Sequence, residues 1–254
     1  MKLGEPDEMY GKEVFMRIDD VAKYLTSGRI VDLSLKVMPG RADSPFGAPA
    51  RRYEVKQFDY APMKVWNGPG EIMHYIDMEN HISTHVECPS HFIPARHGRS
   101  APELSEVPLT SFFGTAAFVD CKELPPRTPL TPDVLKKFPI HDGDIVLFGN
   151  CRNLGPKGEE RCHMTKEGAE YLLAKKVKLI GFDDTVIPEN PLILKDLKTA
   201  FTHDLMLSHN IPIIERLANM AQLTKPRFFF FGFPASMGGI DSFPIRAVAI
   251  EGKD

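Results

Sequence analysis

The segment His81-Ile-Ser-Thr-His85-Val-Glu87-Cys-Pro-Ser-His91 holds three of the nine histidines of the chain. In an extended chain, successive side chains point to opposite faces, so one face of this segment carries His81, Ser83, His85 and Glu87. The β-branched residues between them favour a strand, and Pro89 ends it. The segment therefore predicts a β-strand with one apolar face and one face of potential metal ligands.

A helix is the alternative conformation for this segment. It also brings His81 and His85 together, because residues four apart share one face of a helix. Glu87 then points elsewhere, and Pro89 breaks the turn. The strand groups all three candidate ligands, so it is the preferred interpretation.

Two imidazoles and one carboxylate are the usual protein ligands of a catalytic metal ion, with a further position open for water. Such an ion lowers the pKa of its water from about 16 to ~7 and polarises a bound carbonyl. A histidine outside the ligand set can transfer the proton, and His91 is placed for that role. These ligand types suit Zn, Mn or Fe. Each residue alone has an ordinary alternative as an exposed or structural side chain, but their grouping favours a metal site.

The chain has 254 residues and a formal net charge of −3, without a block of Lys and Arg. We expect one domain spanning residues 1–254, large enough to form a core without disulfides. Nothing in the charge pattern suggests a nucleic-acid partner, and no apolar run reaches the ~18 residues of a membrane span. A cytoplasmic protein acting on a small-molecule substrate is the expectation. The four cysteines form no C-x-x-C pair, so we expect free thiols rather than a zinc ribbon.

Short segments rich in β-branched and aromatic residues predict strands, and fewer segments predict helices. The predicted strands are residues 29–33, 52–58, 72–78, 115–120, 144–149, 178–182, 211–214, 227–231 and 245–250. The predicted helices are residues 18–26, 131–138 and 165–174, and the predicted loops are residues 37–52, 123–131 and 150–158. Strands outnumber helices, so an α/β fold with mixed sheets fits better than an eight-stranded α/β barrel.

The histidine segment resembles the signature H-x-G-T-H-x-D-x-P-x-H of the cyclase-like metal hydrolases, the group that includes bacterial kynurenine formamidase (arylformamidase) and isatin hydrolase. His81, Thr84, His85, Pro89 and His91 match this signature. The resemblance extends to further blocks in the same order. These are Arg29-Ile-Val-Asp-Leu-Ser34, Gly181-Phe-Asp-Asp-Thr185, His203 with Glu215, Glu215-Arg-Leu-Ala-Asn219 and residues 233–249.

The resemblance implies a swivelling β/β/α fold, a divalent metal (Zn or Mn, one or two per subunit) and a homodimer or homotetramer. By the same resemblance, His81, His85 and Glu87 would hold a first ion, and Glu87 with His203 and Glu215 would hold a second. His91 would transfer the proton.

The two downstream residues also have ordinary interpretations. His203 lies in Thr202-His-Asp-Leu-Met-Leu, which predicts the start of a helix capped by Thr202. Glu215 follows the apolar run 211–214, where an acidic residue at a strand end is common. Only the resemblance assigns them as ligands.

Three departures from the family pattern concern the substrate and the site. Ser83 replaces the glycine of the signature, where a positive φ would strain it and a plain strand would not. Glu87 replaces the aspartate, and its longer arm still binds metals. The early W-P-G segment of the formamidases is Val37-Met-Pro-Gly40 here, so Trp66 is the candidate aromatic contact for the substrate, as Ser83 is a polar one.

Three functional hypotheses follow. The first is a metal-dependent amidohydrolase of the arylformamidase type, acting on a substrate such as N-formylkynurenine. The second is a hydrolase of the same fold acting on a cyclic amide of the isatin kind, an imide or a lactone. The third is a catalytically silent binding protein that keeps the fold.

Overall fold

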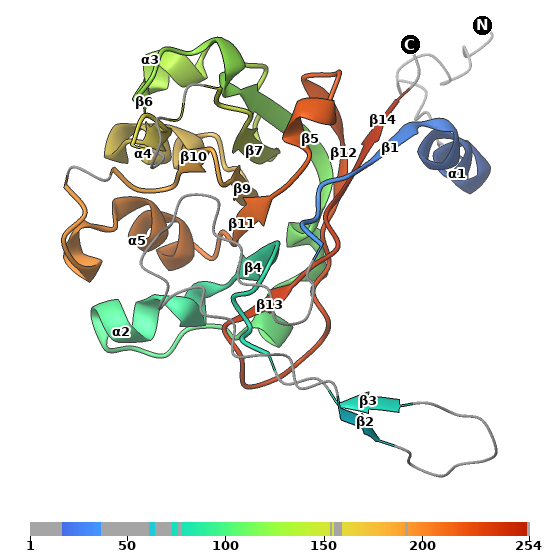
Figure 1. Ribbon diagram of the computed structural model, residues 1–254, viewed down its shortest axis with the longest axis horizontal. Helices are drawn as coiled ribbons and strands as arrows, with labels where there is room; N and C mark the ends of the chain where they lie inside the picture. Colours follow the sequence, from blue (N-terminus) through green and yellow to red (C-terminus); the bar gives the residue numbers. More distant parts are fainter. Residues whose placement is uncertain are drawn as a thin grey trace, which may run out of the picture.

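The computed structural model describes residues 17–36, 61–63, 73–75, 78–152, 154, 159–190 and 193–252 (Figure 1). The predicted strand 52–58, the predicted loop 37–52 and Trp66 lie outside the described residues. The helices within the described residues are α1 (Ile18–Ser27), α2 (Ile93–His97), α3 (Pro132–Leu135), α4 (Lys166–Ala174) and α5 (Phe201–Ser208). The strands there are β1 (Arg29–Asp32), β2 (Ala61–Met63), β3 (Met73–Tyr75), β4 (His85–Glu87), β5 (Phe113–Asp120), β6 (Pro129–Leu130), β7 (Ile145–Gly149), β8 (Cys162–Met164), β9 (Leu179–Asp183), β10 (Val186–Ile187), β11 (Ile213–Leu217), β12 (Arg227–Phe231), β13 (Ser242–Pro244) and β14 (Val248–Glu251).

A mixed nine-stranded sheet forms the centre of the molecule, in the order β1-β14-β12-β5-β7-β9-β11-β4-β13. β5, β7, β9 and β11 are parallel neighbours, and the strands on both sides of this block pair antiparallel. A parallel sheet β10-β8-β6 and an antiparallel pair β2-β3 are the other two sheets in the described part of the chain. The predicted α/β class with mixed sheets is therefore confirmed.

The parallel block has apolar side chains on both faces, as a sheet covered on both sides requires. On β7, Val146 and Phe148 belong to a core cluster with α4 residues Ala169 and Leu172. The alternating residues Ile145 and Leu147 belong to a second cluster. Figure 1 shows α3, α4 and α5 on one side of the parallel strands, and the strands β12, β14 and β1 extend away from these helices.

The phenylalanine run of β12 alternates between the core and the opposite face. Phe228 and Phe230 are buried, whereas Phe229 and Phe231 are half-buried. Phe231 stacks on Phe113 of β5, with ring centroids 6.2 Å apart. The run is thus a strand with one apolar face in the core and one aromatic face outside it. The expected homodimer or homotetramer stays a prediction.

Several predicted elements match closely. β12 has the predicted bounds, and α4 begins after Thr165, whose hydroxyl accepts a 3.0 Å hydrogen bond from the Gly168 amide. The helix predicted for 131–138 ends earlier, at Leu135. The strand predicted for 245–250 is shorter, at 248–251, and a separate strand β13 precedes it. No helix among the described residues is long and apolar enough to cross a membrane.

The predicted strand from His81 is wrong in its first half. The strand β4 begins only at His85, and Ser83 has a φ of 60°, in the left-handed region. A left-handed residue breaks the alternation of a strand, so His81 reaches the ligand cluster from a turn rather than along an extended face. The short β4 nevertheless lies between β11 and β13 and is buried.

Candidate metal centre

The site is built where β4, β11 and α5 meet. β4 carries His85 and Glu87, and its partner β11 places Glu215 directly opposite His85. The register of β11 with β9 shifts between Ile214 and Leu217, at the point where Glu215 lies. Such a bulge re-aims a side chain that regular pairing would point elsewhere. Helix α5 adds His203, and the 3₁₀ turn Pro89–His91 adds His91.

Glu87 is the centre of the cluster and is completely buried. Its Oε1 lies 3.1 Å from Nδ1 of His81, 3.5 Å from Nε2 of His85 and 3.6 Å from Nε2 of His91. Its Oε2 lies 3.4 Å from Nε2 of His203. The two oxygens of one carboxylate therefore face different histidines, an arrangement that suits a bridging ligand.

Glu215 closes the cluster from the β11 side. Its Oε1 lies 3.6 Å from Nε2 of His203, and its Oε2 lies 3.9 Å from Nε2 of His85. All five predicted ligands and the predicted proton-transfer residue His91 are thus brought together from β4, β11, α5, the 3₁₀ turn Pro89–His91 and the turn that carries His81.

The residues fit a cation at this place. Nδ1 of His85 lies 2.8 Å from the carbonyl oxygen of Ser83, so this nitrogen carries the proton and Nε2 presents a lone pair. Nε2 of His85 and Oε2 of Glu87 are buried and have no hydrogen-bond partner among the described residues. Buried acceptors without a donor are costly, and a shared cation removes that cost.

Two groups have ligand atoms that all lie within 4.8 Å of one another. One is His81, Glu87 and His91, and the other is His85, Glu87 and Glu215. Both groups share Glu87, as a two-ion site would. They differ from the ligand sets that the family resemblance implies, because His91 stands in the first and His203 in neither.

The contacts between carboxylates and imidazoles shift the pKa values of the cluster. Burial disfavours the charged form of His81, but its hydrogen bonds to Asp241 and Glu87 outweigh burial and raise the pKa of His81 to about 9. Burial also opposes charge on His203, and three neighbouring carboxylates raise its pKa well above the ordinary value. Burial raises the pKa of Glu87, yet the adjacent histidines hold it well below the ordinary value.

Sequence reasoning missed Asp241. Its Oδ2 accepts hydrogen bonds from Nε2 of His81 (3.0 Å) and from Nδ1 of His91 (2.7 Å), and Asn80 donates to its Oδ1 over 2.6 Å. These contacts leave Nδ1 of His81 and Nε2 of His91 facing Glu87. One carboxylate therefore orients a predicted ligand and the predicted proton-transfer residue together. No local pattern marks it, because it lies 150 residues beyond His91.

Glu189 was missed as well. Its Oε1 lies 2.8 Å from Nδ1 of His203 and accepts from the amide of His203 at 2.9 Å. Its Oε2 accepts from the amide of Thr202. Thr202, predicted as the helix cap, is instead inside α5, and the buried Glu189 binds the free amides at the helix start. Glu189 thereby fixes the ring of His203 with Nε2 towards Glu87.

Ser83 does not lie on the ligand face. Its hydroxyl donates to the carbonyl of Leu35, and the neighbouring Thr84 hydroxyl accepts from the amide of Leu35 at 2.8 Å. These bonds attach the turn before β4 to the segment after β1. The proposed contacts of Ser83 and Trp66 with a substrate stay predictions.

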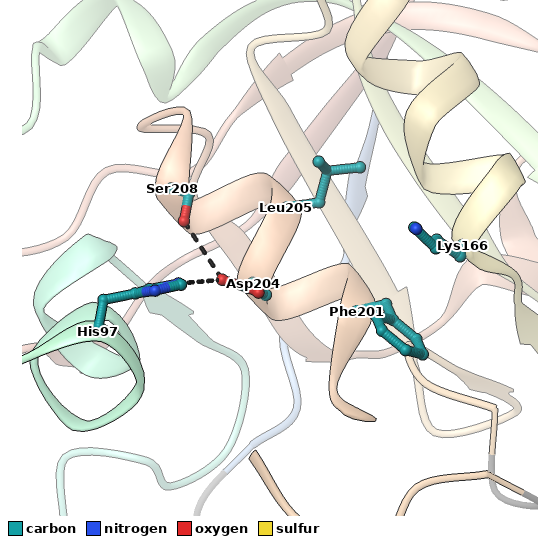
Figure 2. Close-up of a pocket in the computed structure, with 6 residues that line it drawn as sticks. All are labelled: His97, Lys166, Phe201, Asp204, Leu205 and Ser208. Atoms are coloured by element: carbon teal, nitrogen blue, oxygen red, sulfur yellow. Dashed lines mark hydrogen bonds and ion pairs between the residues drawn. The ribbon is translucent and has the colours of Figure 1, made fainter. Parts of the chain in front are cut away.

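A separate hollow of about 250 Å³ lies beside α5 and is lined by His97, Lys166, Phe201, Asp204, Leu205 and Ser208 (Figure 2). Nε2 of His97 lies 2.5 Å from Oδ1 of Asp204, and Lys166 lies over the ring of Phe201. None of the six is a predicted ligand or proton-transfer residue. The hollow is therefore distinct from the metal centre, although Asp204 follows His203 in the chain.

Comparisons with known proteins place the chain in a family. The family described as "Putative cyclase" matches residues 31–187, more than half of the chain. This range contains His81, His85, Glu87 and His91. A search of curated proteins found no match.

Solved structures share the fold. Isatin hydrolase A from Labrenzia aggregata is 20% identical with a TM-score of 0.71, covering 93% of this chain and 99% of its own. Isatin hydrolase A from Ralstonia solanacearum is 22% identical with a TM-score of 0.67, covering 95% and 100%. A predicted metal-dependent hydrolase from Bacillus stearothermophilus is 21% identical with a TM-score of 0.61, covering 88% and 98%. With the match over residues 31–187, the chain belongs to the cyclase family.

Proposed function

We propose that this protein is a metal-dependent hydrolase that cleaves the C–N bond of a small amide. The observation that carries the proposal is the pair of buried acceptors, Nε2 of His85 and Oε2 of Glu87, which have no hydrogen-bond donor among the described residues. They lie in one cluster with His91, a base held in position by Asp241. A ligand set and a placed base are the two parts that this reaction class needs.

His81, His85 and Glu87 would hold one divalent ion, and Glu87 with His203 and Glu215 would hold a second. A bound ion of this kind lowers the pKa of water and polarises a carbonyl. Zn and Mn both accept imidazole and carboxylate ligands, so the metal is identified by measurement.

His91 performs the proton transfers in this proposal. Its Nδ1 donates to Asp241, which leaves the Nε2 lone pair directed towards Glu87, 3.6 Å away. Nε2 accepts a proton from the attacking water and returns it to the amide nitrogen as the C–N bond breaks. The carboxylate of Asp241 stabilises the imidazolium between these two transfers.

Two substrate classes are proposed, and each has its own support. The fold shared with isatin hydrolases supports a cyclic amide. The signature residues Thr84, His85, Pro89 and His91 are common to the group that includes the formamidases, so an aryl formamide of the N-formylkynurenine type is the other class, with the missing early Trp against it. A catalytically silent binding protein is the alternative in which the ligand cluster binds an ion without turnover.

The test combines metal analysis with a substrate panel. The purified protein is stripped with a chelator, reloaded with Zn or Mn, and assayed with isatin, N-formylkynurenine, a cyclic imide and a lactone. We expect metal-dependent turnover of one of the amides, its loss in His91→Asn with metal content retained, and its retention in the exposed control His209→Ala. A folded protein that binds no metal contradicts the proposal, and metal binding without any turnover supports the silent alternative.

A further inference from the structure

Three of the four cysteines lie close to one another beside strands of the two parallel sheets, and none of them belongs to the ligand cluster. Cys121 directly follows β5, Cys151 lies two residues after β7, and Cys162 begins β8. All three are buried and belong to the same core cluster. Chain segments that are distant in sequence thus bring three thiols to one place, whereas the fourth, Cys88, lies in the histidine segment.

The sulfur atoms of Cys151 and Cys162 lie 3.6 Å apart. A disulfide has an S–S length of about 2 Å, so the two sulfurs must approach by about 1.6 Å to form the bond. The Cys121 thiol lies close enough to Cys162 to lower its pKa. Among the described residues, the groups whose ligand atoms all lie within 4.8 Å of one another contain no cysteine. The geometry therefore suits a bond between two sulfurs better than a metal bound by three.

We propose that Cys151 and Cys162 form a redox-active dithiol, a modification site that a hydroperoxide converts into a disulfide. The sulfur of Cys162 attacks one peroxide oxygen, the O–O bond breaks, and a sulfenic acid and water (or an alcohol) result. The sulfur of Cys151 then attacks the sulfenic sulfur, the S–O bond breaks, and the thiol proton leaves with the oxygen as a second water. Two electrons pass from the two thiols to the peroxide.

The order of the two attacks follows from the surroundings of each sulfur. The hydrogen bond from Cys121 lowers the pKa of Cys162 to about 7, against burial and with help from Cys151. Burial raises the pKa of Cys151 to about 11, and the neighbouring Cys162 adds to this. The thiolate is the nucleophile in such reactions, so the lower pKa of Cys162 favours its attack on the peroxide, and Cys151, with its sulfur 3.6 Å away, is placed to resolve the intermediate.

The dithiol is linked to the metal centre through the small sheet. Cys162 pairs with Val186 of β10, and the chain after β10 leads to Glu189, which holds the ring of His203. The amide of Cys151 donates to the hydroxyl of Thr185 over 2.8 Å, just before β10. A disulfide would therefore fasten the segment that positions one predicted ligand, whatever the substrate of the enzyme is.

The experiment uses the full-length protein, reduced with dithiothreitol, freed of reductant and treated with hydrogen peroxide. We expect a mass loss of about 2 Da, two of the four thiols protected from alkylation after denaturation, and a reducible peptide linking Cys151 to Cys162. Retention of all four thiols, or a disulfide between any other pair, overturns the proposal.

Two matched variants sharpen this test. Cys88→Ser removes a buried cysteine outside the cluster and should leave the mass loss unchanged. Cys151→Ser should abolish the reducible link and convert Cys162 into an oxygen adduct instead, with a mass gain of about 16 Da or 32 Da. The same 2 Da loss in Cys151→Ser contradicts the assignment.

Discussion

Two buried carboxylates, Glu87 and Asp144, differ in how their oxygens are satisfied. Asp144 accepts from both terminal nitrogens of Arg227 (2.5 and 2.9 Å), from the amide of His141 (2.7 Å) and from the hydroxyl of Thr115 (2.9 Å). Glu87 lies against the imidazoles of four histidines, and its Oε2 has no hydrogen-bond partner in the described part of the chain. A carboxylate satisfied by its own chain stabilises the fold, whereas one left incomplete is ready for a ligand from outside.

The largest expected effect is the loss of the metal in Glu87→Gln. This change removes the negative charge that all the surrounding histidines face. Mutating a residue that only orients a metal ligand typically lowers metal affinity 10- to 100-fold, so the loss of Glu87 itself should lower it by more than about 100-fold. Equilibrium dialysis with Zn or Mn, followed by metal analysis, measures it. If Glu87→Gln kept the metal content of the unchanged protein, Glu87 would not be a metal ligand and would not differ from Asp144 in this respect.

The second largest effect is expected in the pH dependence of metal binding, which involves the cluster around Glu87 and not Asp144. The pKa of His81 is raised from 6.5 to about 9 in the chain without metal, so below pH 9 an ion must displace its proton. Apparent affinity should fall about tenfold per displaced proton for each unit below pH 9. Competition with a chelator from pH 6 to 9.5 measures this, and a flat profile would contradict it.

The same shift has a stability consequence for the metal-free protein. A raised histidine pKa contributes stability that is complete below pH 6.5 and disappears as the pH rises through about 9. Asp144 behaves in the opposite way. Its pKa is lowered, because the hydrogen bonds of Arg227 outweigh burial, so its contribution disappears only as the pH falls below 3.8. Urea denaturation of chelated protein should show both losses, at opposite ends of the pH range.

Asp241→Asn should lower metal affinity by about 10- to 100-fold, the range for groups that orient a ligand. If the single oxygen of the amide accepts from His81 and His91, its NH2 group faces the donating side-chain amide of Asn80, so at least one of the three contacts is lost. Chelator competition measures the change. Asp204→Asn is the matched control, because Asp204 also binds a histidine, His97, but lies in the hollow outside the cluster. Equal losses in the two variants would argue against a positioning role for Asp241.

Asp144→Asn should reduce stability and leave the metal centre intact. Removing one member of a buried ion pair typically costs about 3 kcal/mol, because Arg227 keeps a charge without its partner. Chemical denaturation should show this loss while metal content per folded molecule stays unchanged. If Asp144→Asn lost metal but no stability, Asp144 would serve the metal centre rather than the fold.

The smallest effect is expected at Ser83. Ser83→Gly relieves a left-handed backbone but loses the hydrogen bond to Leu35, so the stability change should stay within about 1 kcal/mol. Ser83→Ala keeps the strain and loses the bond, and should cost about 1 kcal/mol. Thermal and urea denaturation of the pair test this, and a larger loss in the glycine variant would contradict it.

The sequence predicted those parts of the fold that depend on local patterns. β12 follows its run of phenylalanines, and α4 follows its threonine cap. The left-handed turn at Ser83 was not predictable from alternation, because the residue is held by a hydrogen bond to Leu35, 48 positions away. Short strands such as β8 and β10 have too few residues for a periodic signal.

The candidate site divides in the same way. His81, His85, Glu87 and His91 are visible within one segment, and the resemblance to the family supplied the two downstream ligands. Asp241 and Glu189 were not predicted, because each acts through a hydrogen bond to a histidine that is distant in the sequence. Only the tertiary structure brings such positioning residues next to the ligands.

The position of β4 has a consequence for how the molecule is made. Its two neighbours are β11, at residues 213–217, and β13, at residues 242–244, while β1 pairs with β14 at residues 248–251. Most of the sheet around the histidine segment is therefore synthesised long after the segment itself. Such non-local pairing slows folding, because the chain loses the entropy of closing long loops before the strand contacts can compensate for it. We expect the nascent chain to bind metal only after the ribosome has released nearly all of it, so a protein truncated before Asp241 should carry the whole signature and still load no ion.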